Sequence, residues 1–164
     1  MKKLVLMTVL TLFAFNVSAQ DGDDDSGDGG WSVEFNVGLP IGDAGDFTSF
    51  AVSANFRYTW EVTDGFQLGP TTGYGHWFGK DGISDLQFVP VAANLEAEVS
   101  DGISAGGDVG YAINVGSGGG GDFYYNIRIA VEIADDSEVT GSFANISGTG
   151  VTFSAIQVGY RLGF

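Results

Sequence analysis

Apolar and polar residues alternate along most of this chain, from Trp31 to its last residue. The final nine residues show the pattern most clearly. One set of alternate positions there is apolar: Ile156, Val158, Tyr160, Leu162 and Phe164. The other set is small or polar: Gln157, Gly159, Arg161 and Gly163. Successive side chains of a β-strand point to opposite faces, so this stretch is predicted to be a strand with one apolar face.

The same alternation predicts eight strands that are joined as antiparallel hairpins. They are expected at about 31–41, 50–62, 66–78, 89–99, 103–115, 125–133, 138–146 and 151–164. Residues 43–46, 63–65, 100–102 and 134–136 have turn composition, and 79–85, 116–121 and 147–150 are expected to be loops. Pro70 predicts a kink or bulge in the third strand, because proline cannot donate to the ladder.

The alternation leaves open which face meets solvent. A soluble lipocalin-like barrel would place the apolar face inside. However, roughly three dozen large side chains would not fit an eight-stranded barrel, whose interior is only just filled by its own lining. The opposite face is rich in Gly, Ala, Ser and Asn, which suits a narrow lumen. Aromatic residues near the strand ends are typical of membrane-interface girdles: Trp60, Phe66, Trp77, Phe78, Phe123 and Tyr125. We therefore predict an all-β, eight-stranded antiparallel up-and-down transmembrane β-barrel over residues 31–164.

The first 30 residues differ from the rest of the chain. Residues 1–19 combine Lys2 and Lys3, an apolar run and a small-residue cleavage site, which predicts a secretory signal peptide. Residues 20–30 are acidic and of low complexity, and are expected to be disordered. Aspartates 21, 23 and 25 have the first spacing of a calcium loop, but its glycine is displaced and its twelfth position is Ser32. Weak, non-specific cation attraction is expected there, with no metal site.

The charge and the absence of cysteine narrow the class of protein. The formal net charge is −15, and removal of the two signal lysines makes it −17. Nucleic-acid binding needs Lys and Arg to displace counterions, so this class is excluded. The chain has no Cys, which excludes a disulfide, a thiolate metal site and an acylated lipobox cysteine. No cofactor is implied.

Charged residues on the polar face are predicted to meet inside the barrel. These are Glu34, Arg57, Glu61, Glu96, Glu98, Asp108, Arg128, Glu132 and Arg161. A buried charge is costly unless it is paired, so a salt-bridge plug is expected. The alternative is a proton or ion path that the same pairs would gate.

The single histidine, His76, could serve an enzyme only with a nucleophile such as Ser84 and an acid. One histidine without a placed nucleophile is a weak signal, and no enzymatic activity is expected. A position at the lipid headgroups is the simpler interpretation of His76.

The terminal strand and the eight-strand pattern over 31–164 resemble the small outer-membrane β-barrels of Gram-negative bacteria, of the OmpX or OmpW type. That resemblance implies an outer-membrane location, lipid as a partner, and the terminal strand as the signal read by the barrel-assembly machinery. The loops are short, which does not favour adhesion. A monomer with a structural or passive role is expected, either in membrane integrity or in binding a small apolar molecule at the outer rim. The alternatives are a secreted soluble barrel and, more distantly, a lipid A-modifying enzyme.

Overall fold

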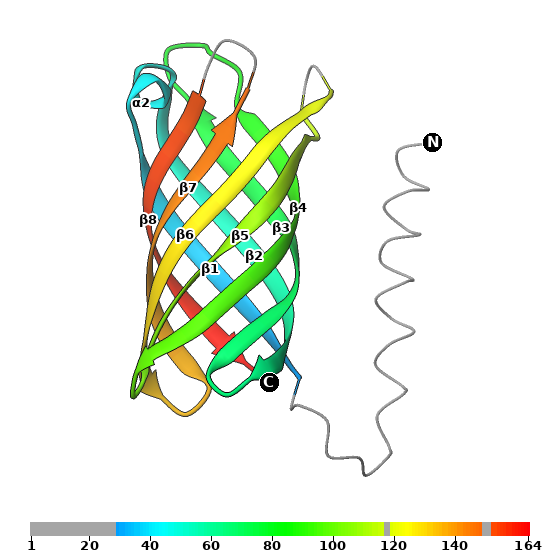
Figure 1. Cartoon of the computed structure of the whole chain (residues 1–164). Coiled ribbons are helices and arrows are strands. Elements are labelled where there is room, and N and C mark those ends of the chain that lie inside the picture. The colour runs from blue at the N-terminus through cyan, green and yellow to red at the C-terminus, as the bar shows by residue number, and fades with distance from the viewer. Residues whose placement is uncertain (1–28, 117–118, 149–151) are drawn as a thin grey trace.

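The computed structural model describes residues 29–116, 119–148 and 152–164, which form a closed β-barrel (Figure 1). Each strand pairs antiparallel with its neighbour in the chain, and β1 closes the barrel against β8. The elements are β1 (Gly30–Ile41), α2 (Asp43–Phe47), β2 (Thr48–Thr63), β3 (Phe66–Gly79), β4 (Leu86–Ser100), β5 (Ile103–Asn114), β6 (Gly121–Ala134), β7 (Ser137–Ser147) and β8 (Thr152–Gly163). The predicted fold class is confirmed.

The barrel closes through the ladder between β1 and β8. Its register runs from Ser32 opposite Gly163 to Ile41 opposite Ser154. Beyond the ladder, the Trp31 amide donates to the Phe164 carbonyl at 3.1 Å, and the Phe164 amide donates to the Trp31 carbonyl at 2.9 Å. A closed sheet has no unpaired edge, so the backbone groups of the strands are satisfied within the barrel.

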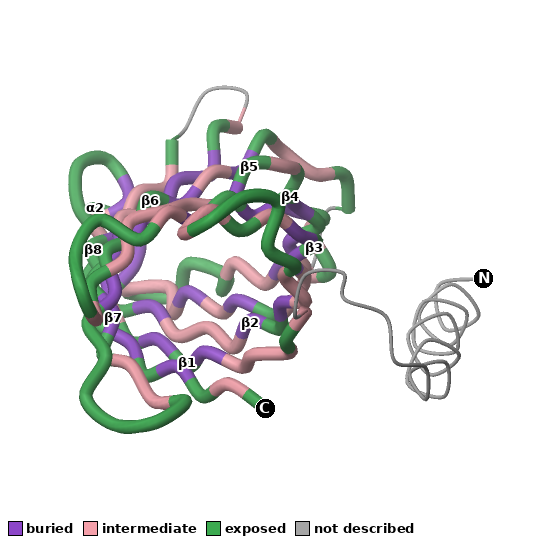
Figure 2. The backbone as a smooth tube through the Cα atoms, turned by 60° about the horizontal axis from the view of Figure 1, so that its bottom comes forward, coloured by how far each residue is buried: buried purple, intermediate pink, exposed green. Residues whose placement is uncertain are grey.

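The apolar face of the strands lies outside. Val158 is 59% exposed and Ile129 is 57% exposed, whereas the inward residues Arg57 and Asp108 are almost fully buried. Figure 2 shows the resulting alternation of buried and exposed residues along the strands, viewed from below. A lipocalin-like barrel requires the opposite arrangement, so that alternative is wrong.

The two ends of the barrel differ. The short-turn end has the turns at 64–65, 101–102 and 135–136, where Gly65, Gly102 and Asp136 adopt φ values of 70°, 68° and 57°. Next to each turn the register shifts by a bulge, between Glu61 and Thr63 for example. The loop end has α2 and residues 80–85, so the turn predicted at 43–46 is one turn of helix.

A kink or bulge was predicted at Pro70, and the register shows no bulge there. Arg57 pairs with Thr71 and Trp60 pairs with Leu68, so the register is the same on both sides of Pro70. On the other edge of β3, Pro70 lies opposite Ala93 in an unbroken register. The bulges of β2 and β3 lie instead near the strand ends, where the chain must twist into a turn or loop.

The predictions for the N-terminal segment fall largely outside the described residues. The signal peptide at 1–19 lies outside them, and of the acidic segment at 20–30 the structure describes only Gly29 and Gly30, the latter being the first residue of β1. Within the described part of the chain, no helix is long and apolar enough to span a membrane.

Candidate functional site in the barrel lumen

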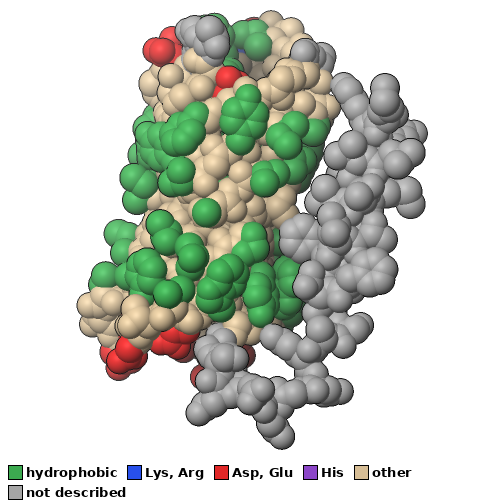
Figure 3. Space-filling view, turned by 45° about the vertical axis from the view of Figure 1, so that its right-hand side comes forward, with side chains coloured by type: hydrophobic (Ala, Val, Ile, Leu, Met, Phe, Trp, Pro, Cys, Tyr) green, Lys and Arg blue, Asp and Glu red, His purple; other side chains and the backbone are tan. Residues whose placement is uncertain are grey.

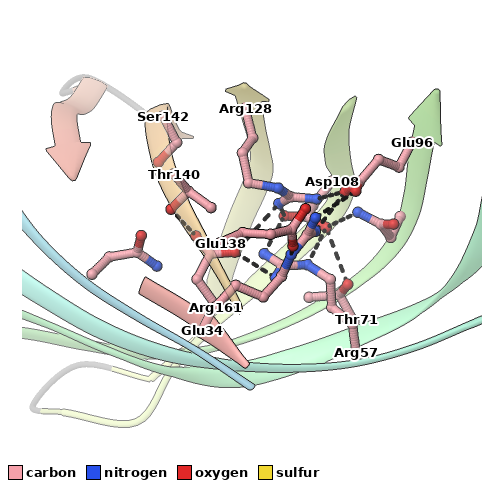
Figure 4. A network of polar contacts seen from close by, with 12 residues as sticks. Glu34, Arg57, Thr71, Glu96, Asp108, Arg128, Glu138, Thr140, Ser142 and Arg161 are labelled. Atoms are coloured by element: carbon pink, nitrogen blue, oxygen red, sulfur yellow. Dashed lines mark hydrogen bonds and ion pairs between the residues drawn. The ribbon is translucent and has the colours of Figure 1, made fainter. Parts of the chain in front are cut away.

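Asp108 on β5 is the centre of a buried polar network in the half of the lumen nearer the short turns (Figure 4). Its carboxylate accepts hydrogen bonds from the Arg57 guanidinium, at 3.4 Å from both Nε and Nη2. It also accepts from Arg128 Nη1 at 3.2 Å, Thr71 Oγ1 at 3.0 Å and Asn94 Nδ2 at 2.9 Å. The Asp108 side chain is fully buried, so its charge is compensated within the protein.

Glu34 and Glu96 complete the buried network on either side of Asp108. Arg57 Nη1 donates to Glu34 Oε2 at 2.5 Å, and Thr140 Oγ1 donates to Glu34 Oε1 at 3.1 Å. Glu96 accepts from Arg128 Nη2 at 2.8 Å and from both terminal nitrogens of Arg161, at 2.6 and 2.7 Å. The Arg161–Glu96 pair is bidentate, which fixes the orientation of both side chains.

The structure brings six of the nine charged residues predicted for the lumen into this network: Glu34, Arg57, Glu96, Asp108, Arg128 and Arg161. Glu61, Glu98 and Glu132 share their inward face but lie exposed at the short-turn end, where the barrel opens. The carboxylate of Glu61 accepts the backbone N–H of Gly65 instead. These three residues are therefore outside the network, contrary to the sequence-based prediction.

One network member, Glu138 on β7, was missed. It pairs with Arg161 Nε and lies directly opposite Arg161 in the β7–β8 register. Only Val139 and Phe143 mark an apolar face in that strand, so its inward face was hard to assign from the sequence. The spacing of Glu138, Thr140 and Ser142 at alternate positions was the available signal.

A cavity of about 910 Å³ opens below the network at the short-turn end. Its lining includes eight acidic residues and one basic residue, Arg161: Glu61, Asp64, Glu96, Glu98, Asp101, Glu132, Asp136 and Glu138. Acidic side chains are also visible at this end in Figure 3. Among the described residues, no group of three or more His, Asp or Glu side chains is placed to hold a metal ion. The acidic lining of this cavity, hereafter the vestibule, gives it a field that attracts cations.

An apolar cluster occupies the lumen at the loop end. It consists of Trp77, Phe88, Tyr124, Ile146 and Phe153 together with small residues such as Ala51 and Ala155. The Trp77 ring centroid lies 6.5 Å from that of Phe88 and 5.9 Å from that of Phe153, and both ring pairs pack edge to face. The lumen therefore contains two groups of side chains along its length, ion pairs in one half and packed rings in the other.

Trp77 corrects the set of interface aromatics. It was expected at the membrane interface, but it is 0% exposed and lies inside the barrel. The reason is register, because residue 77 shares its face of β3 with Thr71, Gly73 and Gly75. The other predicted members are on the outside, where Trp60 and Phe123 are exposed and Phe66, Phe78 and Tyr125 are half-buried.

His76 lies on the outer face of β3, near the loop end. Its Nε2 is 2.8 Å from Asp85 Oδ2, its Nδ1 is 3.3 Å from the Tyr74 hydroxyl, and its ring stacks on Phe78 at 4.2 Å. The Gly79 amide, which donates at 2.9 Å, and then the His76 ring hold the pKa of Asp85 below its ordinary value. Across the described residues, no hydrogen bond joins His76 to Ser84, the nucleophile that an enzyme would need.

The terminal strand presents its apolar residues to the outside. Ile156, Val158, Tyr160 and Leu162 of β8 and the following residue Phe164 are all exposed hydrophobics. The strand pairs with β1 on one edge and β7 on the other. Its role as an assembly signal stays a prediction.

The comparisons with known proteins agree on the fold. No protein-family model matches the chain, and no curated protein matches its sequence. Among solved structures, the Ail protein of Yersinia pestis superposes with a TM-score of 0.58 at 12% identity, covering 85% of this chain and 99% of Ail. The chain has the fold of the small eight-stranded outer-membrane barrels. Neisserial surface protein A gives a TM-score of 0.54 at 9% identity, covering 86% of this chain and all of that one.

A de novo designed barrel, TMB2.3, is equally similar, with a TM-score of 0.57 at 12% identity over 87% of this chain and 96% of the design. A designed protein can thus share this fold with Ail, which its full name calls an attachment invasion locus protein. Fold alone therefore does not determine the function of this chain, which must be argued from its own residues.

Proposed function

We propose that the chain is an integral outer-membrane protein with a closed lumen and a structural, passive role in that membrane. The location is supported by the outward apolar face, by the fold shared with outer-membrane barrels and by the export signal expected at residues 1–19. The passive role is supported by one observation, which is that ion pairs and packed rings form two successive layers of side chains in the lumen.

Each layer obstructs ions for a different physical reason. In the first layer, Arg57, Arg128 and Arg161 are held by carboxylates, so a passing ion would have to break buried pairs. In the second layer, Trp77, Phe88 and Phe153 pack closely and offer an ion few groups to replace its hydration shell. An ion or solute that crosses the acidic vestibule therefore stops at the network.

The proposal includes no enzymatic activity. Asp85 and Tyr74 give His76 two hydrogen-bonding partners, but Ser84 is not bonded to it. The contacts of His76 on the outer surface support a position among lipid headgroups, where an amphipathic ring is favoured.

Conductance across a planar lipid bilayer tests the closed lumen. Because the two layers lie in series, we expect no steady conductance from the wild type, from Arg128→Ala or from Trp77→Ala. The double variant that combines Arg128→Ala with Trp77→Ala removes a side chain from both layers, so the inserted protein should conduct. Glu98→Gln, in the open vestibule, is the matched control and should show no steady conductance, whether made alone or combined with either single variant. A large, stable conductance of the wild-type protein would overturn the proposal.

Membrane fractionation and gel migration test the location separately. A folded membrane barrel should remain with the outer membrane after a carbonate wash and should migrate differently before and after boiling. Recovery of the wild-type protein in the aqueous fraction without detergent would contradict the proposed location.

A further inference from the structure

The outer surface of the barrel has a groove across β4 and β5, with an almost entirely apolar surface and a volume of about 410 Å³. Its lining includes Phe66 of β3 on one side and Phe123 and Tyr125 of β6 on the other. The charged residues that contribute to the groove, Glu96 and Asp108, have buried side chains in the lumen network, so they add no free charge to it. It is therefore an apolar recess on the side of the barrel that faces away from the lumen.

Small side chains create the recess. In register, Gly107 lies between Leu95 and Ile127, and the next outward row places Ala97 beside Ala105. Adjacent strands are about 4.8 Å apart, so Leu95 and Ile127 stand about 9.6 Å apart with no side chain between them. That gap lets one hydrocarbon chain contact both walls at about 4 Å.

The depth of the recess is fixed by the backbone. A Cβ atom added to Gly107 would lie 2.3 Å from the Asn126 carbonyl oxygen, so a larger residue could not be accommodated there without a backbone shift. The alanines at 97 and 105 extend the floor of the groove towards the short-turn end.

We infer that this groove, hereafter the β4–β5 groove, holds one acyl chain of a phospholipid more persistently than the rest of the barrel surface does. The inference rests on the proposed membrane location. The groove is continuous with the outward apolar surface, so in a bilayer the surrounding hydrocarbon is acyl chain, which outcompetes any dilute apolar ligand. Ala97 and Ala105, at one end of the groove, lie close to the turn at 101–102, whereas Phe123 and Tyr125 lie nearer the loop end, so the groove runs lengthwise within the apolar belt.

The size of the groove agrees with this occupant. A methylene group takes about the volume of a water molecule, roughly 30 Å³, so the groove has room for roughly a dozen methylenes. Lipid is as apolar as the groove, so the hydrophobic effect contributes nothing and retention depends on dispersion contacts with the two walls. These contacts are individually weak, so we expect an enrichment of about threefold to tenfold over the open surface.

Photo-crosslinking tests the inference. The wild-type protein is reconstituted in phosphatidylcholine bilayers with a trace of phosphatidylcholine that bears a diazirine in its acyl chain, and the labelled residues are mapped by mass spectrometry. We expect labels on Leu95 and Ile127 at about threefold or more over Val37 and Val158, which are exposed valines on β1 and β8. Equal labelling around the barrel would overturn the inference.

Filling the groove gives the matched variants. Ala105→Phe should abolish the enrichment, whereas Ala54→Phe, on the outer face of β2, should leave it unchanged. Ala105→Leu replaces the larger variant if Ala105→Phe does not insert. Persistence of the enrichment in a filled groove would count against the site. Insertion is checked by gel migration before and after boiling, so a failure of the membrane location is seen separately.

A second copy of the chain is the competing occupant. The chain has no cysteine, so Ala105→Cys introduces a single thiol at the floor of the groove. We expect no disulfide-linked dimer in the bilayer after mild oxidation, because an acyl chain occupies the groove. Efficient dimer formation would assign the groove to a barrel–barrel contact and overturn the lipid site.

Discussion

Asp108→Ala should destabilise the barrel more than the loss of any exposed carboxylate. The substitution removes five hydrogen bonds from four side chains, and it removes the carboxylate between Arg57 and Arg128. Removing one partner of a buried ion pair typically costs about 3–5 kcal/mol, because the remaining charge stays buried and uncompensated. Arg57 keeps Glu34 and Arg128 keeps Glu96, so the hydrogen bonds do not add independently, and we expect a loss of about 3–5 kcal/mol.

The assay is reversible urea unfolding in phospholipid vesicles, followed by tryptophan fluorescence and compared at matched lipid-to-protein ratio. Asp108→Asn preserves the shape and one acceptor oxygen, so it should lose less stability than Asp108→Ala. Glu98→Ala is the control, because Glu98 is exposed at the vestibule and takes no part in the ion pairs of the network; it should change stability by about 0.5 kcal/mol or less. If Asp108→Ala also changed it by less than about 1 kcal/mol, the network would not support the fold as argued.

Three further outcomes are expected. Ile129→Arg should cost about 2–4 kcal/mol in bilayers, because it puts a charge on the lipid-facing surface, whereas inward Asn126→Ser should cost much less in the same unfolding assay; equal costs would mean that the faces are wrongly assigned. Deletion of Phe164, which closes the barrel through Trp31, should lower the inserted fraction on heat-modified gels but leave export intact, and full insertion would refute its assembly role. The pKa of Asp85 is lowered in the folded protein, so its carboxylate stabilises the contact with the Gly79 amide above the unfolded pKa and loses that effect as pH falls. The protection of the Gly79 amide against hydrogen exchange should therefore drop below about pH 4, and Asp85→Asn should abolish this pH dependence.

Local pattern explains why so much of the fold could be predicted. A strand has a period of two residues, so the alternation in a single strand fixes which side chains share a face. In β8 this places Val158 and Tyr160 on one face and Gln157 and Arg161 on the other. The composition of the two faces then indicated that the apolar face is outside, and the exposure of these residues in the structure agrees.

The wrong predictions were those that assigned a residue from its type or from its closeness to a strand end, and not from the register of its strand. Trp77 was assigned to the interface because it is aromatic and near a loop, although its position in the alternation is inward. Glu98 and Glu132 were assigned to the network because they are charged and inward, but they lie too far towards the open end. Alternation gives the face of a residue and not its height along the barrel axis.

The sequence by itself therefore determined the number of strands, their faces and the antiparallel hairpin topology, because these follow from interactions between neighbours in the chain. Only the tertiary structure decided which inward residues meet. Arg161 of β8 and Glu96 of β4 are 65 residues apart and lie on non-adjacent strands, and they pair across the lumen because closure and strand tilt bring them to the same height. The same closure separates the inward aromatic rings from the ion pairs, and places Gly107 between Leu95 and Ile127 on the outer surface. These juxtapositions depend on the register of every strand pair around the barrel, and the sequence of a single strand does not determine that register.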